Sequence, residues 1–265
     1  MKTPSPRCNT ETMRETVIIK LAETDSTNRF LRDYRGETGL RMTVATAEHQ
    51  TAGRGQGGNT WESEAGRNIL LSVMTHPQGL AARRQFVMLE AGALAVRDTL
   101  TLHADGFSIK WPNDIYWHDM KISGTLSECD ISRGMVGRCI LGTGININQR
   151  TFTGSAPNPV SLWQITGQET DRNQITDELL KRLEHYLDMV DTGRYSDIHD
   201  MYAGSLYRRN GLHAYRDAGG VFMARIERIE PDGRLVLHRT DGSLKEYMFK
   251  EVEHIITPCP TTTRQ

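Results

Sequence analysis

The sequence has little cysteine and no long apolar segment. Its 265 residues include four cysteines, Cys8, Cys129, Cys139 and Cys259, whose spacing matches no pair of metal ligands. We expect reduced thiols in a cytoplasmic protein, although Cys129 and Cys139 could face each other across a hairpin. No apolar run approaches the roughly 20 residues that cross a bilayer. The polar N-terminus also lacks the apolar core of a secretory signal, so no membrane segment is expected.

An excess of charge of either sign is missing as well. The chain has 32 basic and 33 acidic residues, which gives a formal net charge of −1. Proteins that bind DNA through its phosphates carry a strongly basic surface, so a dedicated DNA-binding protein is not expected. The length suits one large domain, or a large and a small one.

Glycine, in contrast, is concentrated in residues 47–61, AEHQTAGRGQGGNTW. Such glycines allow left-handed backbone angles and let the chain approach a ligand closely. The segment matches the G-x-G-x-x-G dinucleotide pattern, but a strand rather than a helix is predicted after it, and no GK[ST] phosphate loop is present. We expect a loop that is flexible when empty and folds over a phosphate-bearing ligand. A plain solvent-exposed loop is the alternative.

The hydrophobic pattern predicts a strand-rich centre between helices. Asp25, Ser26 and Thr27 offer N-cap side chains to a short helix. Three further helices are predicted, at 86–100, around 175–190 and at 198–206. Strands are predicted at 17–21, 42–47, 68–74, 107–110, 115–117, 122–128 and 138–148. The fold class is therefore α+β, a mixed central sheet with flanking helices.

Short alternating runs replace this pattern after Leu206. Runs at 212–215, 221–229, 235–238 and 244–249 are separated by glycine-containing turns, which predicts a small antiparallel β-barrel. We expect three parts: a flexible tail over 1–15, a large domain over 16–206 and a small C-terminal domain over 207–258.

Residues 110–114, KWPND, place an ammonium, an amide and a carboxylate beside a proline at a strand end. Asp114 offers a hard oxygen to Mg²⁺, and Lys110 could offset the charge of a phosphate. A proline-ended strand with a capped turn is the alternative for this stretch.

Two further stretches carry polar groups near the same region. If residues 115–117 pair with 122–125, the turn between them brings Lys121 back toward Asp114; a solvent-exposed lysine is the alternative. Residues 142–148, GTGININ, put Asn146 and Asn148 on one strand face, and the glycines would let a ligand lie flat on the sheet.

Five stretches together resemble one family, the biotin protein ligases. They are TDSTN at 24–28, the glycine loop at 47–61, IKWPNDIY at 109–116, KISGTLSE at 121–128 and GTGININ at 142–148. Each alone is weak, but all five stand in the family's order and spacing. These motifs cover residues 17–148, and the similarity in architecture extends to about residue 256.

The resemblance implies a class II synthetase-like catalytic domain of the biotin–lipoate ligase type, followed by an SH3-like β-barrel. Members of the family condense biotin with ATP, assisted by Mg²⁺, to biotinyl-5′-AMP and pyrophosphate. They then transfer biotin to a lysine of a biotin carboxyl carrier protein or carboxylase carrier domain. The resemblance therefore implies a cytoplasmic ligase that forms a carbon–nitrogen bond. A homodimer through an exposed sheet edge is one option.

The resemblance also assigns roles to matching residues. Lys121 and Arg54 would be catalytic, and Asp114 would hold Mg²⁺. The biotin-binding residues would be Ser26, Thr27, Asn28, Gln50, Gly53, Arg54, Lys121 and Gly124. The ATP-binding residues would be Arg54, Gln56, Trp61, Lys110, Asn113 and Asn146.

The sequence departs from the family pattern at Gln56, where the best-known pattern has a second arginine that helps to retain the adenylate. Neutral hydrogen bonds are weaker than charge-assisted ones, so we expect this chain to release the adenylate more readily. Only about 23 residues precede TDSTN, too few for the winged-helix DNA-binding domain of some members, so no repressor function is expected.

Three other functions compete with this one. Lipoate–protein ligases share the fold and the adenylation chemistry, but their motifs differ. A non-catalytic biotin-binding regulator is disfavoured because Arg54, Lys110, Asp114 and Lys121 are all present. A nicotinamide-dependent dehydrogenase is disfavoured because no helix is predicted after the glycine loop.

Overall fold

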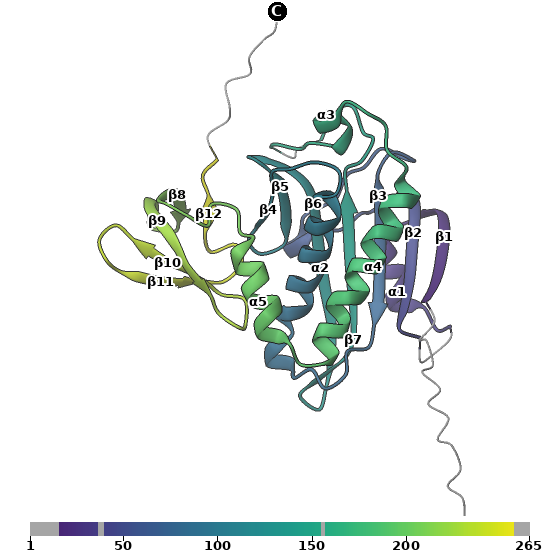
Figure 1. Cartoon of the computed structure of the whole chain (residues 1–265), viewed down its shortest axis with the longest axis horizontal. Coiled ribbons are helices and arrows are strands. Elements are labelled where there is room, and N and C mark those ends of the chain that lie inside the picture. The colour runs from purple at the N-terminus through teal and green to yellow at the C-terminus, as the bar shows by residue number, and fades with distance from the viewer. Residues whose placement is uncertain (1–15, 37–39, 155–156, 257–265) are drawn as a thin grey trace, which may run out of the picture.

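The computed structural model describes residues 16–36, 40–154 and 157–256. The predicted tail at 1–15, Cys8, Cys259 and the end of the predicted C-terminal domain at 257–258 lie outside these residues. A large α/β body and a smaller β lobe lie side by side (Figure 1). No helix in the described ranges combines the length and the apolar character needed to cross a bilayer.

The large body is built on a seven-stranded sheet in the order β1-β2-β3-β7-β6-β5-β4. β1 and β2 are parallel, and every other neighbouring pair is antiparallel, which confirms the predicted mixed sheet. The strands are β1 (Thr16–Thr24), β2 (Met42–Gln50), β3 (Ile69–Thr75), β4 (Phe107–Lys110), β5 (Asp114–Trp117), β6 (Met120–Ser132) and β7 (Met135–Ile145).

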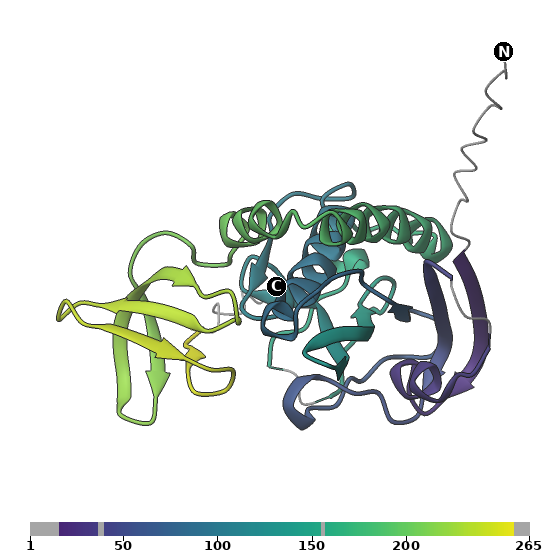
Figure 2. The same ribbon diagram turned by 90° about the horizontal axis from the view of Figure 1, so that it is seen from below.

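Helices cover both faces of this sheet. α2 (Phe86–Leu100), α4 (Arg172–Asp191) and α5 (Tyr195–Gly204) lie on one face (Figure 2), where they enclose the main hydrophobic core. The shorter α1 (Thr27–Asp33) packs on the other face in a small cluster with Leu31 at its centre. The alternation of side chains along β2 and β3 supplies apolar residues to both faces.

Two of these helices show why the hydrophobic pattern worked. α2 is apolar around nearly its whole circumference, and the stretch from Val87 to Val96 is buried between the sheet and α4. α4 is amphipathic, and its N-cap Asp171 accepts a hydrogen bond of 2.8 Å from the backbone N–H of Asn173.

The start of α1 differs from the prediction. Ser26 is the N-cap residue, but its side chain makes no capping hydrogen bond. The only backbone N–H that donates to the Asp25 carboxylate among the described residues is that of Ser26, at 2.6 Å, and the carboxylate also pairs with Arg29. The acceptor comes from β2 instead: Gln50 Oε1 accepts from the Thr27 N–H at 2.8 Å and from Thr27 Oγ1 at 3.0 Å. Because β1 and β2 are paired, Gln50 lies beside Thr24 and reaches the helix end.

Some short elements were not predicted. α3 (Leu162–Thr166) begins at a capping box in which Ser161 and Gln164 exchange hydrogen bonds, a signal that the sequence does carry. Two 3₁₀ turns, η1 (Gln56–Gly58) and η2 (Ala82–Arg84), complete the body.

The C-terminal lobe is a five-stranded antiparallel sheet in the order β11-β10-β9-β8-β12, compatible with an SH3-like domain. Its strands are β8 (His213–Asp217), β9 (Gly220–Ile229), β10 (Leu235–Arg239), β11 (Leu244–Tyr247) and β12 (Glu253–His254). Four strands confirm the predicted runs, and β12 was missed because two residues carry no alternation. Leu206, the predicted boundary, bridges β4 at Ile109, and the division into domains there stays a prediction.

Candidate active site

Two neighbouring cavities share Trp61 and Lys121 as lining residues. The inner cavity has a volume of about 40 Å³ and the outer cavity about 520 Å³. The inner cavity is lined by Ser26, Thr27, Asn28, Gln50, Arg54, Gly55, Gln56, Trp61, Leu71, Asn113, Asp114, Lys121, Gly124, Thr125, Leu126, Gly142, Thr143 and Gly144. The outer cavity is lined by Gly58, Asn59, Thr60, Trp61, Glu62, Lys121, Asn146, Gln149, Phe152, Thr153, Gly154, Pro157 and Pro159.

A buried polar network forms one wall of the inner cavity. Ser72 Oγ contacts Thr27 Oγ1 at 2.7 Å and Asn28 Oδ1 at 2.5 Å. Asn28 Nδ2 donates to Glu128 Oε2 at 3.0 Å. Together with Gln50 on Thr27, these bonds fix the direction of each polar group, so the wall can recognise a ligand with a defined pattern of donors and acceptors.

Lys121 and Asp114 meet where the two cavities adjoin. Lys121 Nζ lies 2.7 Å from Asp114 Oδ1 and 5.7 Å from the centre of the Trp61 ring. Asp114 is paired with Gly124 across β5 and β6, and a register shift after Ile115 sets Lys121 beside Tyr116. The predicted hairpin therefore brings Lys121 back to Asp114, as expected.

Gly124 leaves the space that this ion pair occupies. An added Cβ there would lie 3.2 Å from Asp114 Oδ1 and 3.4 Å from Lys121 Nζ. Any side chain at Gly124 would therefore press on both charged groups.

The glycine loop closes over the inner cavity as a small hairpin. The Gly55 N–H donates to Asn59 O at 2.7 Å, and the Trp61 N–H donates to Gly53 O at 3.0 Å. The Arg54 guanidinium lies 3.3 Å from Glu128 Oε1, which ties the loop to β6. The loop is thus folded in this structure, and its flexibility in the absence of a ligand stays a prediction.

Two cavity-lining residues of the loop have a buried polar atom without a hydrogen-bond partner among the described residues, Gln56 Oε1 and Trp61 Nε1. The amide of Gln56 is exposed to the inner cavity, and the indole of Trp61 belongs to both cavities. A buried polar group without a partner is costly, so each is a group that a ligand could satisfy.

The stretch at 142–148 was predicted incorrectly in one respect. β7 ends at Ile145, so Asn146 and Asn148 do not share a strand face. Gly142 and Gly144 line the inner cavity, and an added Cβ would overlap the Asn28 side chain at one and the Trp61 ring at the other. The glycines make room for these two side chains.

Asn146 still faces the outer cavity. Its Nδ2 donates to Val160 O at 3.1 Å, and its buried Oδ1 has no partner in the described part of the chain. The Asn146 amide is thus held through its Nδ2, and its Oδ1 can accept a hydrogen bond from a ligand.

The predicted ATP-binding residues Lys110 and Asn113 occupy different places. Asn113 lines the inner cavity, where its Nδ2 donates to Thr125 O at 2.6 Å and holds the KWPND turn against β6. Lys110 lines neither cavity. Its ammonium lies over the Tyr116 ring at 5.3 Å, and burial lowers its pKa, while Asp114 opposes that shift.

The two remaining predicted parts of the site are Gly53 and the Mg²⁺ ligand. Gly53 does not line either cavity; it packs against the Gln50 side chain and the Trp61 backbone. For Mg²⁺, no cluster of three or more His, Cys, Asp or Glu occurs in the described ranges. Asp114 alone would supply protein oxygen, which fits an ion held mainly by phosphate and water.

Sequence reasoning missed several lining or supporting residues. Glu128, which holds both Asn28 and Arg54, lies on the same face of β6 as Gly124, so strand alternation could have found it. Residues 152–154, Pro157 and Pro159 gave no signal, because only the fold brings them to the outer cavity.

The fold agrees with that of a solved protein. The structure superposes on biotin protein ligase from Aquifex aeolicus in complex with biotin and ATP with a TM-score of 0.73 and 26% identity, covering 90% of this chain and 99% of that one. The model of the biotin/lipoate A/B protein ligase family matches residues 21–146.

Curated relatives agree. The chain is 30% identical over 233 residues to the biotin--[acetyl-CoA-carboxylase] ligase of Paracoccus denitrificans, covering 84% of this chain and 94% of that one. It is 33% identical over 176 residues to the bifunctional ligase/repressor BirA of Escherichia coli, and that match spans about half of the relative, 54%. This chain belongs to the biotin/lipoate A/B protein ligase family.

Proposed function

We propose that this protein is a biotin–[acetyl-CoA-carboxylase] ligase. It activates biotin with ATP to biotinyl-5′-AMP and pyrophosphate, and it then transfers biotin to a lysine of a carrier protein. The observation that carries this proposal is the position of the Lys121 ammonium, which lines both cavities and so stands where two ligands would meet.

The chemistry requires a cation at that point. The biotin carboxylate attacks the α-phosphate of ATP, and both are anionic, so a fixed positive charge must offset their repulsion as the new bond to phosphorus forms. Lys121 supplies this charge from the boundary of the cavities. Arg54, tethered to Glu128 at 3.3 Å, is the second cation of the inner cavity.

In this proposal the inner cavity receives biotin and the outer cavity receives ATP. The network of Thr27, Asn28 and Gln50 supplies oriented partners for the ureido ring. Ser26 and Gly124 line the pocket, and Gly53 packs against Gln50 and the Trp61 backbone. A volume of about 40 Å³ holds only a few water molecules, so biotin enters only when the Trp61 ring leaves Gly144. On the ATP side, Asn146 Oδ1 and Trp61 Nε1 are unsatisfied polar atoms that could contact the nucleotide.

Mg²⁺, brought by ATP, would be held near Asp114 and would neutralise phosphate charge. Gln56 of the glycine loop and Asn113 of the KWPND turn would contact the adenylate, since both line the inner cavity. Lys110 would act on phosphate only if its side chain moved, because it lines neither cavity.

The remaining parts of the proposal concern location and partners. The acceptor is a biotin carboxyl carrier protein or carboxylase carrier domain, and a cytoplasmic location follows from that acceptor. The free thiols of Cys129 and Cys139 are consistent with a reducing compartment. A homodimer could form through the edge of β1.

The test supplies ATP, Mg²⁺ and a carrier domain together with biotin or lipoate. We expect pyrophosphate release and a gain of one biotin in the carrier mass only with biotin. A lipoate-dependent signal would assign lipoate–protein ligase activity instead. Biotin binding without pyrophosphate release would indicate a non-catalytic regulator, and no biotin-dependent signal would overturn the proposal.

A further inference from the structure

The C-terminal lobe touches the glycine loop through the turn between β11 and β12. Lys250 Nζ donates a hydrogen bond to the backbone carbonyl of Gly57 at the tip of the loop. The contact is close: an added Cβ at Gly57 would overlap Lys250 Cε and would lie 3.2 Å from Phe249 Cε1. Two segments far apart in the sequence therefore meet at Gly57.

The backbone at Lys250 is strained. Its φ is 72°, in the left-handed region that residues with a Cβ rarely adopt. Such strain persists only where surrounding contacts hold the residue in place, and it clusters at functional positions. Among the described residues no carboxylate forms an ion pair with Lys250, so its one polar partner there is the Gly57 carbonyl.

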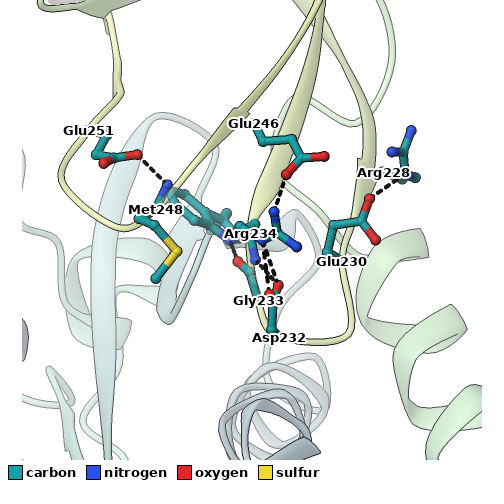
Figure 3. Close-up of polar contacts among 9 residues, drawn as sticks. Arg228, Glu230, Asp232, Gly233, Arg234, Glu246, Met248 and Glu251 are labelled. Carbon is teal, nitrogen blue, oxygen red and sulfur yellow. Dashed lines mark hydrogen bonds and ion pairs between the residues drawn. The ribbon is translucent and has the colours of Figure 1, made fainter. Parts of the chain in front are cut away.

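Hydrogen bonds within the β11–β12 turn also hold the segment that carries Lys250. The Met248 N–H donates to Glu251 Oε2 at 2.7 Å, and the Glu251 N–H donates to Met248 O at 3.1 Å (Figure 3). The adjacent β9–β10 turn is braced by Arg234, which pairs with Asp232 at 2.9 Å and with Glu246 on β11. Lys250 thus lies on a turn that hydrogen bonds within the lobe hold in place.

Trp111 of the KWPND turn anchors the C-terminal lobe to the large body. Its Nε1 donates to Gly233 O at 2.9 Å, and its ring lies 6.3 Å from that of Phe249 between ring centres. Trp111 is buried and lies three residues before Asp114. The C-terminal lobe therefore contacts the large body at two places. One is Trp111 in the KWPND turn, and the other is Gly57 in the glycine loop.

We propose that Lys250 is a positioning residue that holds the glycine loop closed over the inner cavity. Breaking its contact with Gly57 is one step in opening the loop, which lets biotin enter and lets the adenylate leave. The loop-closing role stands on the contacts above, whereas its consequence for the adenylate rests on the proposed function. Because Lys250 is exposed, the expected effect is about fivefold, the scale of one charge-assisted hydrogen bond in contact with water.

Hydrogen exchange on the ligand-free full-length chain tests the loop-closing role without any assumption about activity. Lys250→Asn removes the ammonium but keeps a residue that tolerates a left-handed backbone, and Lys250→Arg keeps the charge. We expect the Gly55 and Trp61 amides to exchange about fivefold faster in Lys250→Asn, and near the wild-type rate in Lys250→Arg. Lys245→Asn is the matched control, since Lys245 pairs with Asp217 on the same lobe and does not contact the loop.

Unchanged exchange in Lys250→Asn would overturn the inference, and so would equally fast exchange in Lys245→Asn, because the effect would then belong to the lobe as a whole. Release of biotinyl-5′-AMP is measured next with the same variants. Faster release of biotinyl-5′-AMP from Lys250→Asn, but not from Lys250→Arg or Lys245→Asn, would support the role of Lys250 in retaining the adenylate. If exchange is faster in Lys250→Asn but the wild-type chain makes no adenylate, the loop contact stands and only the proposed function is refuted.

Discussion

The floor of the inner cavity and the glycine loop above it are built in opposite ways. The floor consists of the paired strands β5 and β6 and the KWPND turn that precedes them, where Asn113 and Thr125 are buried and bonded to each other. The loop is held by a few exposed contacts, chiefly Arg54 with Glu128 and Gly57 with Lys250. Groups that act on reacting atoms gain from a rigid base, while a cover must open. Changes in the floor should therefore affect chemistry and stability, and changes in the loop should affect retention.

The largest effect is expected from Lys121→Ala. Loss of one fixed charge at the reacting centre typically costs about 10²- to 10³-fold in rate, so adenylate formation should fall by that factor while the fold survives. Pyrophosphate release in a single turnover measures it. Lys181→Ala on the outer side of α4 is the control. Adenylate formation at the wild-type rate in Lys121→Ala would refute the proposed role.

The next effect concerns the lobe that supports the cover. Burial lowers the pKa of His254 to about 3 from 6.5, and the charges of Lys110, Arg208 and His213 act in the same direction. Between these two pKa values, His254 is therefore protonated in the unfolded chain but neutral in the native chain. The free energy of unfolding should fall as the pH drops below about 6.5, by at most about 1.4 kcal/mol per pH unit.

Urea unfolding at pH 7.5, 6.5 and 5.5 measures this dependence. His254→Phe removes the titrating group and should flatten the profile relative to the wild type. The same slope in both proteins would show that His254 does not set it.

Asn113→Ala tests how much the floor of the inner cavity contributes to the free energy of unfolding. It leaves Thr125 O without the buried donor at 2.6 Å, so the free energy of unfolding should fall by about 1–3 kcal/mol. Asn59→Ala in the loop should change it by less than about 0.5 kcal/mol, because that side chain is exposed. Urea unfolding of both variants compares floor and loop directly. Equal losses would remove the distinction between them.

Gln56→Arg tests retention by the loop and should give the smallest effect. Its Oε1 is buried at the inner cavity without a partner. A guanidinium there would add a charge-assisted contact to the adenylate and should slow its release by about fivefold. Gln168→Arg adds the same charge on the exposed surface and serves as control. If the wild type and Gln56→Arg release the adenylate at equal rates, Gln56 has no part in retention.

The sequence predicted the fold well because its signals are local. Strand alternation and helical spacing located nearly every long element, and the hairpin that joins Asp114 to Lys121 follows from pairing of neighbours. The features that the sequence did not show lie where distant segments meet. Gln50 replaces the expected cap of α1, Trp61 covers Gly144, and Lys110 turns away from both cavities. None of these contacts leaves a periodic pattern in the chain.

The position of Trp61 has a thermodynamic consequence. Its ring lies on Gly144 and forms part of the wall between the two cavities. A ligand that displaces the ring from one side changes the shape offered to a ligand on the other, so the two affinities cannot be independent. By reciprocity, whatever factor the first ligand imposes on the second, the second imposes on the first. We therefore expect the two pockets to bind their ligands cooperatively if the indole moves when either is filled.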